Sequence, residues 1–283
     1  MKRGLALAAL ALPLLSGPAG AQSGAGTPTQ ITLTPFVFNT IASRNPELDP
    51  APYTYPSGDL QGQVNQNVGD IRLDGVSVNG VNHAPEHLQL VTGARILLDD
   101  AVDAVRGGHN LAAGRGIGAE VDEWVDDGVA TTTPTADDLV ANHGNLNLTS
   151  IVATRESAGT TVFELSFDQP TDRLFIWERG RSGDVLVSAV DDEGQVLGSY
   201  KVLDGTDDGE AAGDYTRTGI TVTTYVLEDF LNQGQELGSV GLHLSEPARA
   251  FRFTVYQEAE GEGAVRYNGP DLKVLALAPA NSG

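Results

Sequence analysis

The acidic stretch that begins at Asp204 has the residue types and spacing of a calcium-binding loop. Its first, third, fifth and sixth positions are filled by Asp204, Thr206, Asp208 and Gly209. The twelfth position of such a loop requires a bidentate glutamate and is Tyr215 here, so an EF-hand is excluded. A looser set of oxygen ligands remains for Ca²⁺, the cofactor that the sequence suggests: Asp204, Asp207, Asp208 and Glu210. The alternative is a solvated acidic hairpin tip, which keeps a chain soluble.

A second group of polar residues flanks two apolar segments that are typical of buried strands. Glu178 and Arg179 end one segment, and Asp271 begins the other. If the two strands are antiparallel neighbours, these side chains lie at the same end of a sheet. Asp184 joins them after a glycine-flanked turn, and Asn268 shortly precedes Asp271. The group predicts either a site for a sugar or Ca²⁺, or a structural network that holds the turn. We favour the network, in which loss of one member leaves a partner unpaired.

The sequence carries no recognisable catalytic motif. It has no cysteine, which excludes disulfides, zinc–thiolate sites, iron–sulfur clusters and a cysteine nucleophile. The Gly-x-Ser-x-Gly pattern of serine hydrolases is absent. A glycosidase needs only two carboxylates, and Glu120 with Glu123, next to Trp124, is the best pair for that role. We therefore expect a non-enzymatic protein, with a carbohydrate-active enzyme or carbohydrate-binding module as the alternative.

Strands must position these side chains, because short apolar segments separated by turns fill the second half of the chain. Residues 163–167 alternate apolar and polar side chains, as in a strand with one buried face. Residues 174–177 are continuously apolar, which predicts a central strand covered on both faces. Gly194 follows three acidic residues and predicts a hairpin turn between 185–189 and 196–202. Further strands are expected at 31–38, 71–78, 86–98, 220–225, 240–244, 251–256 and 272–277.

The whole pattern predicts a mainly β protein. We expect an antiparallel β-sandwich, jelly-roll-like, with one short helix and long acidic loops. The helix is expected at 136–143, because Thr135 and Asp138 have capping-box spacing and a glycine follows that can end it. A helix also competes with a strand for 94–105. Residues 107–132 are glycine-rich and acidic, and they predict a long surface loop.

The N-terminus has the three parts of a secretory signal peptide. Lys2 and Arg3 precede an apolar run, and a small-residue cleavage site ends at Ala21. This predicts a secreted, extracellular or cell-surface protein. No later stretch approaches the roughly 20 apolar residues that span a bilayer, so a transmembrane protein is not expected. The chain divides into three expected segments: a signal peptide at 1–21, a Pro/Gly-rich extended leader at 22–69 and a β-sandwich domain at 70–279.

The charge of the chain limits its partners. The sequence has 38 acidic and 17 basic side chains and a formal net charge of -21. Phosphate contacts need a basic surface, so no nucleic-acid partner is expected. Anionic membrane surfaces are poor partners for the same reason. An acidic surface instead keeps a protein soluble outside the cell and attracts divalent ions.

Several phrases of the sequence resemble those of exosortase-dependent surface proteins, a bacterial family with PEP-CTERM-type sorting signals. They are Gly-Asn-Leu-Asn-Leu at 144–148, Leu-Phe-Ile-Trp-Glu-Arg-Gly at 174–180, Ser-Gly-Asp-Val at 182–185 and Tyr-Asn-Gly-Pro-Asp-Leu-Lys-Val at 267–274. Residues 71–80 fit the family's opening strands. The resemblance covers about residues 70–277. It implies an exported, surface-located protein without established enzymatic activity.

The C-terminus departs from that family pattern. The Pro-Glu-Pro motif, the transmembrane helix and the basic tail of the family are missing. This favours free secretion, or retention by binding to the envelope, over processing by an exosortase. We therefore expect an envelope, matrix or surface-layer component that binds polysaccharide. Its expected partners are envelope polysaccharide or surface-layer components, and self-association is a further alternative.

Overall fold

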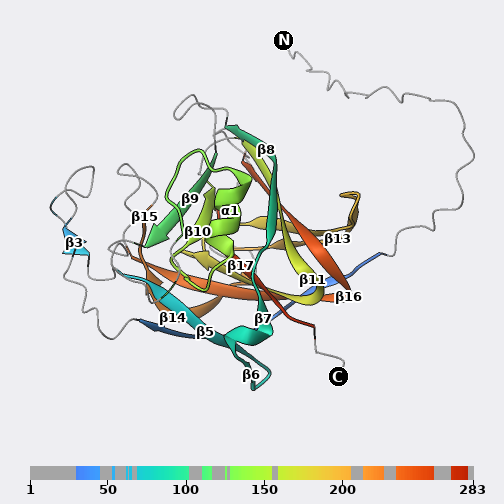
Figure 1. Ribbon diagram of the computed structural model, residues 1–283, viewed down its shortest axis with the longest axis horizontal. Helices are drawn as coiled ribbons and strands as arrows, with labels where there is room; N and C mark the ends of the chain where they lie inside the picture. The colour runs from blue at the N-terminus through green and yellow to red at the C-terminus, as the bar shows by residue number, and fades with distance from the viewer. Residues whose placement is uncertain are drawn as a thin grey trace, which may run out of the picture.

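The computed structural model describes residues 30–44, 53–54, 62, 64–65, 69–101, 110–116, 125, 128–154, 159–204, 213–225, 234–257 and 269–279. Within these residues the chain is mainly β, its strands pair antiparallel, and one short α-helix is present (Figure 1). The predicted fold class is therefore confirmed, while the jelly-roll topology stays a prediction. The described part of the chain contains no helix long and apolar enough to cross a membrane.

The described elements follow one another along the chain with these bounds: β1 (Leu33–Phe36), β2 (Asn39–Arg44), β3 (Tyr53–Thr54), β4 (Val64–Asn65), β5 (Ile71–Val78), β6 (Val81–His83), the 3₁₀-helix η1 (Pro85–His87), β7 (Leu88–Gln89), β8 (Gly93–Ala101), β9 (Leu111–Gly116), α1 (Ala136–His143), β10 (Ile151–Thr154), β11 (Gly159–Arg179), β12 (Val185–Val190), β13 (Val196–Val202), β14 (Thr216–Val222), β15 (Thr224–Tyr225), β16 (Gln235–Gln257) and β17 (Asp271–Leu277).

Two long strands, β11 and β16, pair antiparallel and organise the fold (Figure 1). Their register is interrupted between Ser166 and Arg173, where β11 contains Pro170 and β16 contains Pro247. Proline cannot donate to a strand ladder, which accounts for irregular pairing at this corner. Before the corner β11 pairs with β8, and after it β11 pairs with β17. Each of the two long strands therefore has one half in a first layer and the other half in a second layer.

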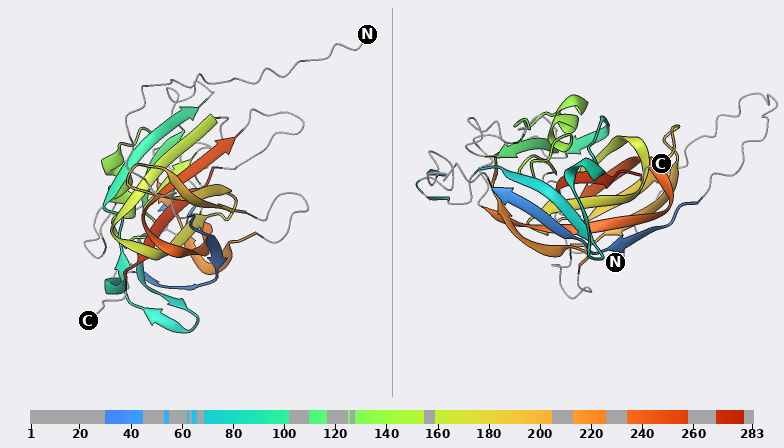
Figure 2. Two further views of the ribbon diagram at one scale, coloured as in Figure 1. Left: turned by 90° about the vertical axis from the view of Figure 1, so that its right-hand side faces the viewer. Right: turned by 60° about the horizontal axis from the view of Figure 1, so that its bottom comes forward.

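The first layer runs in the order β13-β12-β16-β11-β8, and the second continues from β16 through β11, β17, β10 and β9 to β15 (Figure 2). Strands β1 and β14 pair with the half of β16 that belongs to the second layer. Buried side chains from both halves of the long strands join one core cluster: Phe163, Leu165, Leu174, Ile176, Val240, Leu242, Phe251 and Phe253. The two layers therefore face each other across this core, as in a β-sandwich.

A second core lies behind the second layer. Phe175 and Trp177 point to the face of β11 opposite Leu174 and Ile176, and they pack with residues of β5 and with Phe38. The small β2-β5-β6 sheet covers this face. The indole N–H of Trp177 donates to Thr40 Oγ1 of β2 at 2.8 Å. The expectation that 174–177 is covered on both faces is thus confirmed.

Helix α1 has the bounds that its capping signals predict. Thr135 Oγ1 accepts from the Asp138 N–H at 3.3 Å, and Asp138 Oδ2 accepts from the Thr135 N–H at 2.7 Å. These reciprocal bonds are the two halves of a capping box. Leu139 is fully buried in the first core, so the apolar side of the helix closes one end of the sandwich.

Three expectations about elements need correction. Residues 111–116, inside the predicted 107–132 loop, form the buried strand β9, because Leu111 and its small neighbours pair with β10. The single strand predicted at 86–98 is divided into the 3₁₀-helix η1 and the separate strands β7 and β8, and residues 94–101 are in a strand, not in the competing helix. The separate strands predicted at 163–167 and 174–177 are one bent strand, since local periodicity does not show that a strand continues round a corner.

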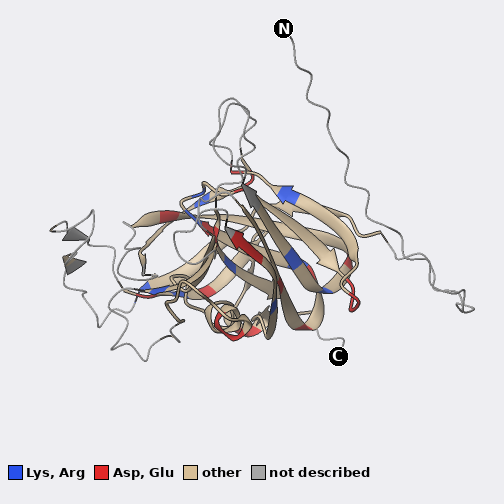
Figure 3. Ribbon diagram, turned by 90° about the horizontal axis from the view of Figure 1, so that it is seen from above, with Lys and Arg blue, Asp and Glu red and all other residues tan. Residues whose placement is uncertain are grey.

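The N-terminal segment also contributes to the sheets. Residues 33–44, which lie within the predicted leader, form β1 and β2, and these strands pair with β16 and β5. Ile31 N–H donates to Leu197 O at 2.9 Å, which attaches the segment to β13 as well. Acidic and basic residues are interspersed over the described strands (Figure 3).

Candidate functional site

The polar group predicted at the ends of β11 and β17 is brought together. The two strands pair with Glu178 opposite Leu272, which places Arg179 beside Asp271. Arg179 Nη2 forms an ion pair with Asp271 Oδ2, and Arg179 Nη1 donates to Gln235 Oε1. The Arg179 and Asp271 side chains are only 4% and 13% exposed, so the pair is largely desolvated.

Glu178 is the deepest acid of this group, at 1% exposure. Its Oε2 accepts from the Ser182 N–H at 3.1 Å, and its Oε1 accepts from the Asp271 N–H at 3.4 Å. Burial, followed by the charge of Asp271, raises the pKa of Glu178 well above its usual range, and Arg179 offsets part of the effect. The bonds made by Glu178 hold the turn that follows β11 against the start of β17.

Asp184 lies on the far side of that turn. Its Oδ2 pairs with Lys201 Nζ at 2.7 Å, and its Oδ1 accepts from the Asp204 N–H at 2.8 Å. Tyr215 lies between this pair and Glu178, and its hydroxyl donates to Gly183 O at 3.2 Å. Burial, with Glu178 and Asp184 nearby, raises the pKa of Tyr215 well above its usual range. Asp184 therefore bonds to Lys201 and Asp204, while Arg179 bonds to Asp271.

The proposed calcium ligands are only partly described. Asp204 is placed beside Asp184, but Asp207, Asp208 and Glu210 lie outside the described residues, as does Asn268. No group of three or more acidic or histidine side chains with metal-binding geometry occurs within the described ranges. The glycosidase pair Glu120 and Glu123 also lies outside them.

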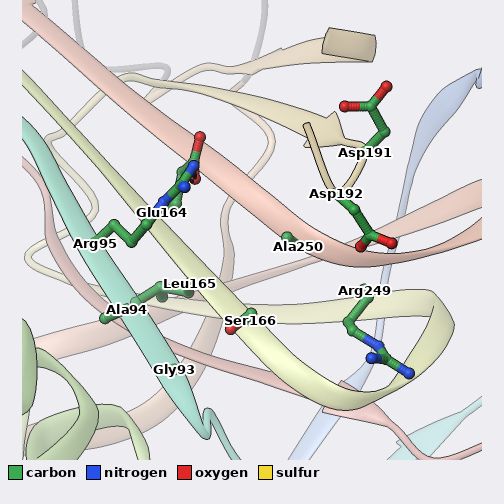
Figure 4. A pocket seen from close by; sticks show the side chains of 10 residues that line it. All are labelled: Gly93, Ala94, Arg95, Glu164, Leu165, Ser166, Asp191, Asp192, Arg249 and Ala250. Atoms are coloured by element: carbon green, nitrogen blue, oxygen red, sulfur yellow. Dashed lines mark hydrogen bonds and ion pairs between the residues drawn. The ribbon is translucent and has the colours of Figure 1, made fainter. Parts of the chain in front are cut away.

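A pocket of about 300 Å³ lies on the face of the first layer that is turned away from the core (Figure 4). Strand β8, the first half of β11, the β12–β13 turn and the corner of β16 supply its lining: Gly93, Ala94, Arg95, Glu164, Leu165, Ser166, Asp191, Asp192, Arg249 and Ala250. The sequence did not indicate this site, because its charged residues are far apart in the chain and each follows a surface-strand pattern.

One side of the pocket is an organised ion cluster. Glu164 is 5% exposed and is held by two guanidinium groups. Arg95 Nε donates to Glu164 Oε2 at 3.0 Å, and Arg252 Nη2 donates to Glu164 Oε1 at 2.7 Å. Arg252 also donates to Gly194 O at 2.7 Å, which ties the hairpin turn to the sheet. The Glu164 carboxylate on this side is therefore held by bonds from two arginine side chains.

The other side carries Asp191, Asp192 and Arg249 (Figure 4). Asp191 Oδ1 accepts from the Glu193 and Gln195 N–H groups at 3.1 and 2.7 Å, so it shapes the turn. Asp192 and Arg249 are exposed. The pocket therefore has charged side chains of both signs on its two sides.

A buried polar cluster that the sequence did not predict lies between α1 and β17. Lys273 is fully buried, and its Nζ donates to Asn142 O at 2.6 Å and to Asn145 Oδ1 at 2.7 Å. Burial lowers the pKa of Lys273 well below its usual range. His143 is also fully buried, and its Nδ1 accepts from the Val274 N–H at 3.2 Å. The available signal was a single lysine within the otherwise apolar run of β17.

Comparison with known proteins adds no relative. No family model matches the chain, and neither a curated protein nor a solved structure is similar to it.

Proposed function

We propose that this chain is an exported, non-enzymatic β-sandwich protein of the bacterial cell surface or extracellular matrix, and that it binds polysaccharide through the pocket between Glu164 and Arg249. The pocket is the observation that carries the proposal. Its volume is at the lower end of the range for small-molecule sites, which suits one unit of a glycan. Sugar hydroxyls donate and accept hydrogen bonds, and the pocket offers both guanidinium donors and carboxylate acceptors.

The bonding of Glu164 supports binding rather than catalysis. Both carboxylate oxygens accept from arginine side chains, one from Arg95 and the other from Arg252. A glycosidase carboxylate must exchange a proton or attack the sugar. A carboxylate whose two oxygens are held by cations is poorly suited to either step.

The proposed location rests on sequence features. The N-terminal signal-peptide pattern supports export, and the resemblance to exosortase-dependent surface proteins supports a place at the cell surface. A chain without cysteine must be stabilised by its core, and both faces of its central strands are buried. Retention would then depend on binding to an envelope component such as polysaccharide or the surface layer.

The test is a pull-down of purified residues 22–283 on envelope and polysaccharide fractions from the producing organism. Wild type is compared with Arg249→Ala and Asp192→Ala, and with Arg217→Ala as a matched control, since Arg217 is an exposed arginine of β14 outside the pocket lining. We expect both pocket variants to lose binding and the control to retain it. Equal binding by all four proteins, or none by wild type, would contradict the proposal.

Three further readouts separate the alternatives. Release of new sugar ends from the bound fraction would favour a carbohydrate-active enzyme. Binding that a chelator abolishes would indicate a Ca²⁺-dependent module and direct attention to Asp204, Asp207, Asp208 and Glu210. A size in light scattering that grows with protein concentration would instead favour self-association.

A further inference from the structure

The environment of Lys273 is unusual for a lysine. Its side chain is fully buried, and both of its hydrogen bonds go to uncharged carbonyl oxygens, Asn142 O and Asn145 Oδ1. The described residues give it no ion pair. A charged ammonium in such a place is disfavoured, so burial lowers the pKa of Lys273 well below its usual range. A neutral, desolvated amine has a free lone pair and is a nucleophile.

The nearest electrophile is the side-chain amide of Asn145. Its Oδ1 lies 2.7 Å from Lys273 Nζ, so the carbonyl carbon Cγ is the next atom along. The same Oδ1 accepts from the Asn147 N–H at 2.9 Å. Asn145 Nδ2 donates to Ala141 O at 2.7 Å, which fixes the plane of the amide. The Asn147 N–H is placed where it would stabilise negative charge developing on Oδ1 during attack.

We propose that Lys273 and Asn145 join in an intramolecular isopeptide bond. Lys273 Nζ bonds to Asn145 Cγ, the Cγ–Nδ2 bond breaks, one proton passes from Nζ to Nδ2, and ammonia leaves. The step needs no oxidant or other co-reactant. Contact between the two groups in a dry site replaces a bimolecular encounter, which lowers the barrier to intramolecular acyl transfer.

The product can keep two of the hydrogen bonds of the site, and it loses the bond from Asn145 Nδ2 to Ala141 O. The new amide retains one N–H, which can still donate to Asn142 O, and its oxygen can still accept from the Asn147 N–H.

The bond would join two residues that are 128 positions apart in the chain. It would fasten the last strand, β17, to the segment that follows α1. Long covalent loops restrict the unfolded chain most, and this is how disulfides stabilise secreted proteins. A cysteine-free exported chain would gain the same kind of constraint without an oxidant.

The test is peptide mapping of the full chain after denaturation and trypsin digestion. The bond blocks trypsin at Lys273, so we expect residues 116–155 to be released joined to 267–283, with a mass lower by one ammonia than the sum of the two peptides. Peptides must be mapped because Gln22, if it becomes the N-terminus, can lose ammonia by cyclisation. Recovery of the two peptides unlinked, with cleavage after Lys273, would overturn the proposal.

Variants of the two lysines provide a negative and a positive control for this peptide map. Lys273→Met should give only the unlinked 116–155 peptide, and Lys201→Met, which removes the other lysine outside the signal-peptide pattern, should keep the joined peptide. If Lys273→Met does not fold, the wild-type map still decides, because it needs no variant.

Discussion

Arg179 and Asp271 form an ion pair across the ends of β11 and β17 from which water is largely excluded. The pair joins the turn after β11 to the first residue of the last strand. Gln235 of β16 bonds to the same guanidinium, so three strands meet at one side chain.

Asp271→Asn should therefore be strongly destabilising, because it leaves the Arg179 charge buried without its partner. Removing one member of a buried pair costs about 3–5 kcal/mol. Urea unfolding measures the loss. The control is Glu236→Gln, which breaks the more exposed 3.2 Å pair with Arg217 and should cost about 0–1 kcal/mol. Similar losses for the two variants would show that the Arg179–Asp271 pair contributes no more to the free energy of unfolding than the exposed pair does.

Glu178→Gln should change how stability depends on pH. The folded pKa of Glu178 is raised, so the folded state binds its proton more tightly than the unfolded state does. Its contribution is complete below the usual value of 4.5 and is lost as the pH rises toward the folded pKa. Glutamine does not titrate, so the variant should gain stability relative to wild type as the pH rises above that value.

Urea unfolding of both proteins at a series of pH values measures this difference. Parallel curves would mean that Glu178 titrates alike in the folded and unfolded chain. A variant with unchanged melting temperature but lost ligand binding would instead assign the Glu178 cluster to a ligand.

Thr135→Ala should cost about 1 kcal/mol, because it removes the hydroxyl that caps α1. That hydroxyl accepts from the Asp138 N–H and donates to Asp138 Oδ2 at 2.8 Å. Thr135→Ser keeps the hydroxyl and should stay close to wild type in thermal unfolding. Equal melting temperatures for the alanine and serine variants would argue against the capping role.

Gly198→Ala should loosen the attachment of the N-terminal segment to β13. A Cβ at this position would lie 1.8 Å from Ile31 O, so the backbone at Ile31 must move away. Overpacking of this kind costs about 1–3 kcal/mol. Hydrogen exchange at the Ile31 N–H should become faster. Val196→Ala, at an exposed position of the same strand, should leave that exchange rate unchanged; if it does not, the effect is not specific to the contact.

The parts of the fold that local chemistry determines could be predicted from the sequence. The bounds of α1 follow from Thr135 and Asp138, which act on neighbouring backbone groups. Gly194 has a φ of 79° and forms the turn between β12 and β13, as its position after three acidic residues indicates. The covering of 174–177 on both faces follows from its lack of polar side chains.

The parts that depend on distant partners could not be predicted in the same way. Strand β9 is buried because β10 and the 128–131 segment pair with it, and its Gly-Arg-Gly ending suggests a loop when read alone. Glu164 and Arg252 each look like the exposed side of a strand, and only the pairing of β11 with β16 makes them neighbours. The burial of Lys273 depends on α1, which lies far away in the sequence.

The passage of β11 and β16 through both layers has a consequence for how the protein unfolds. Neither layer can detach while the other stays intact, because each contains half of the same two strands. We expect the amides of both layers to exchange with solvent in one cooperative opening whose free energy approaches that of global unfolding. The same long-range pairing predicts slow folding, since residues 58 to 98 positions apart, such as Phe163 and Phe253, must meet before the layers are complete.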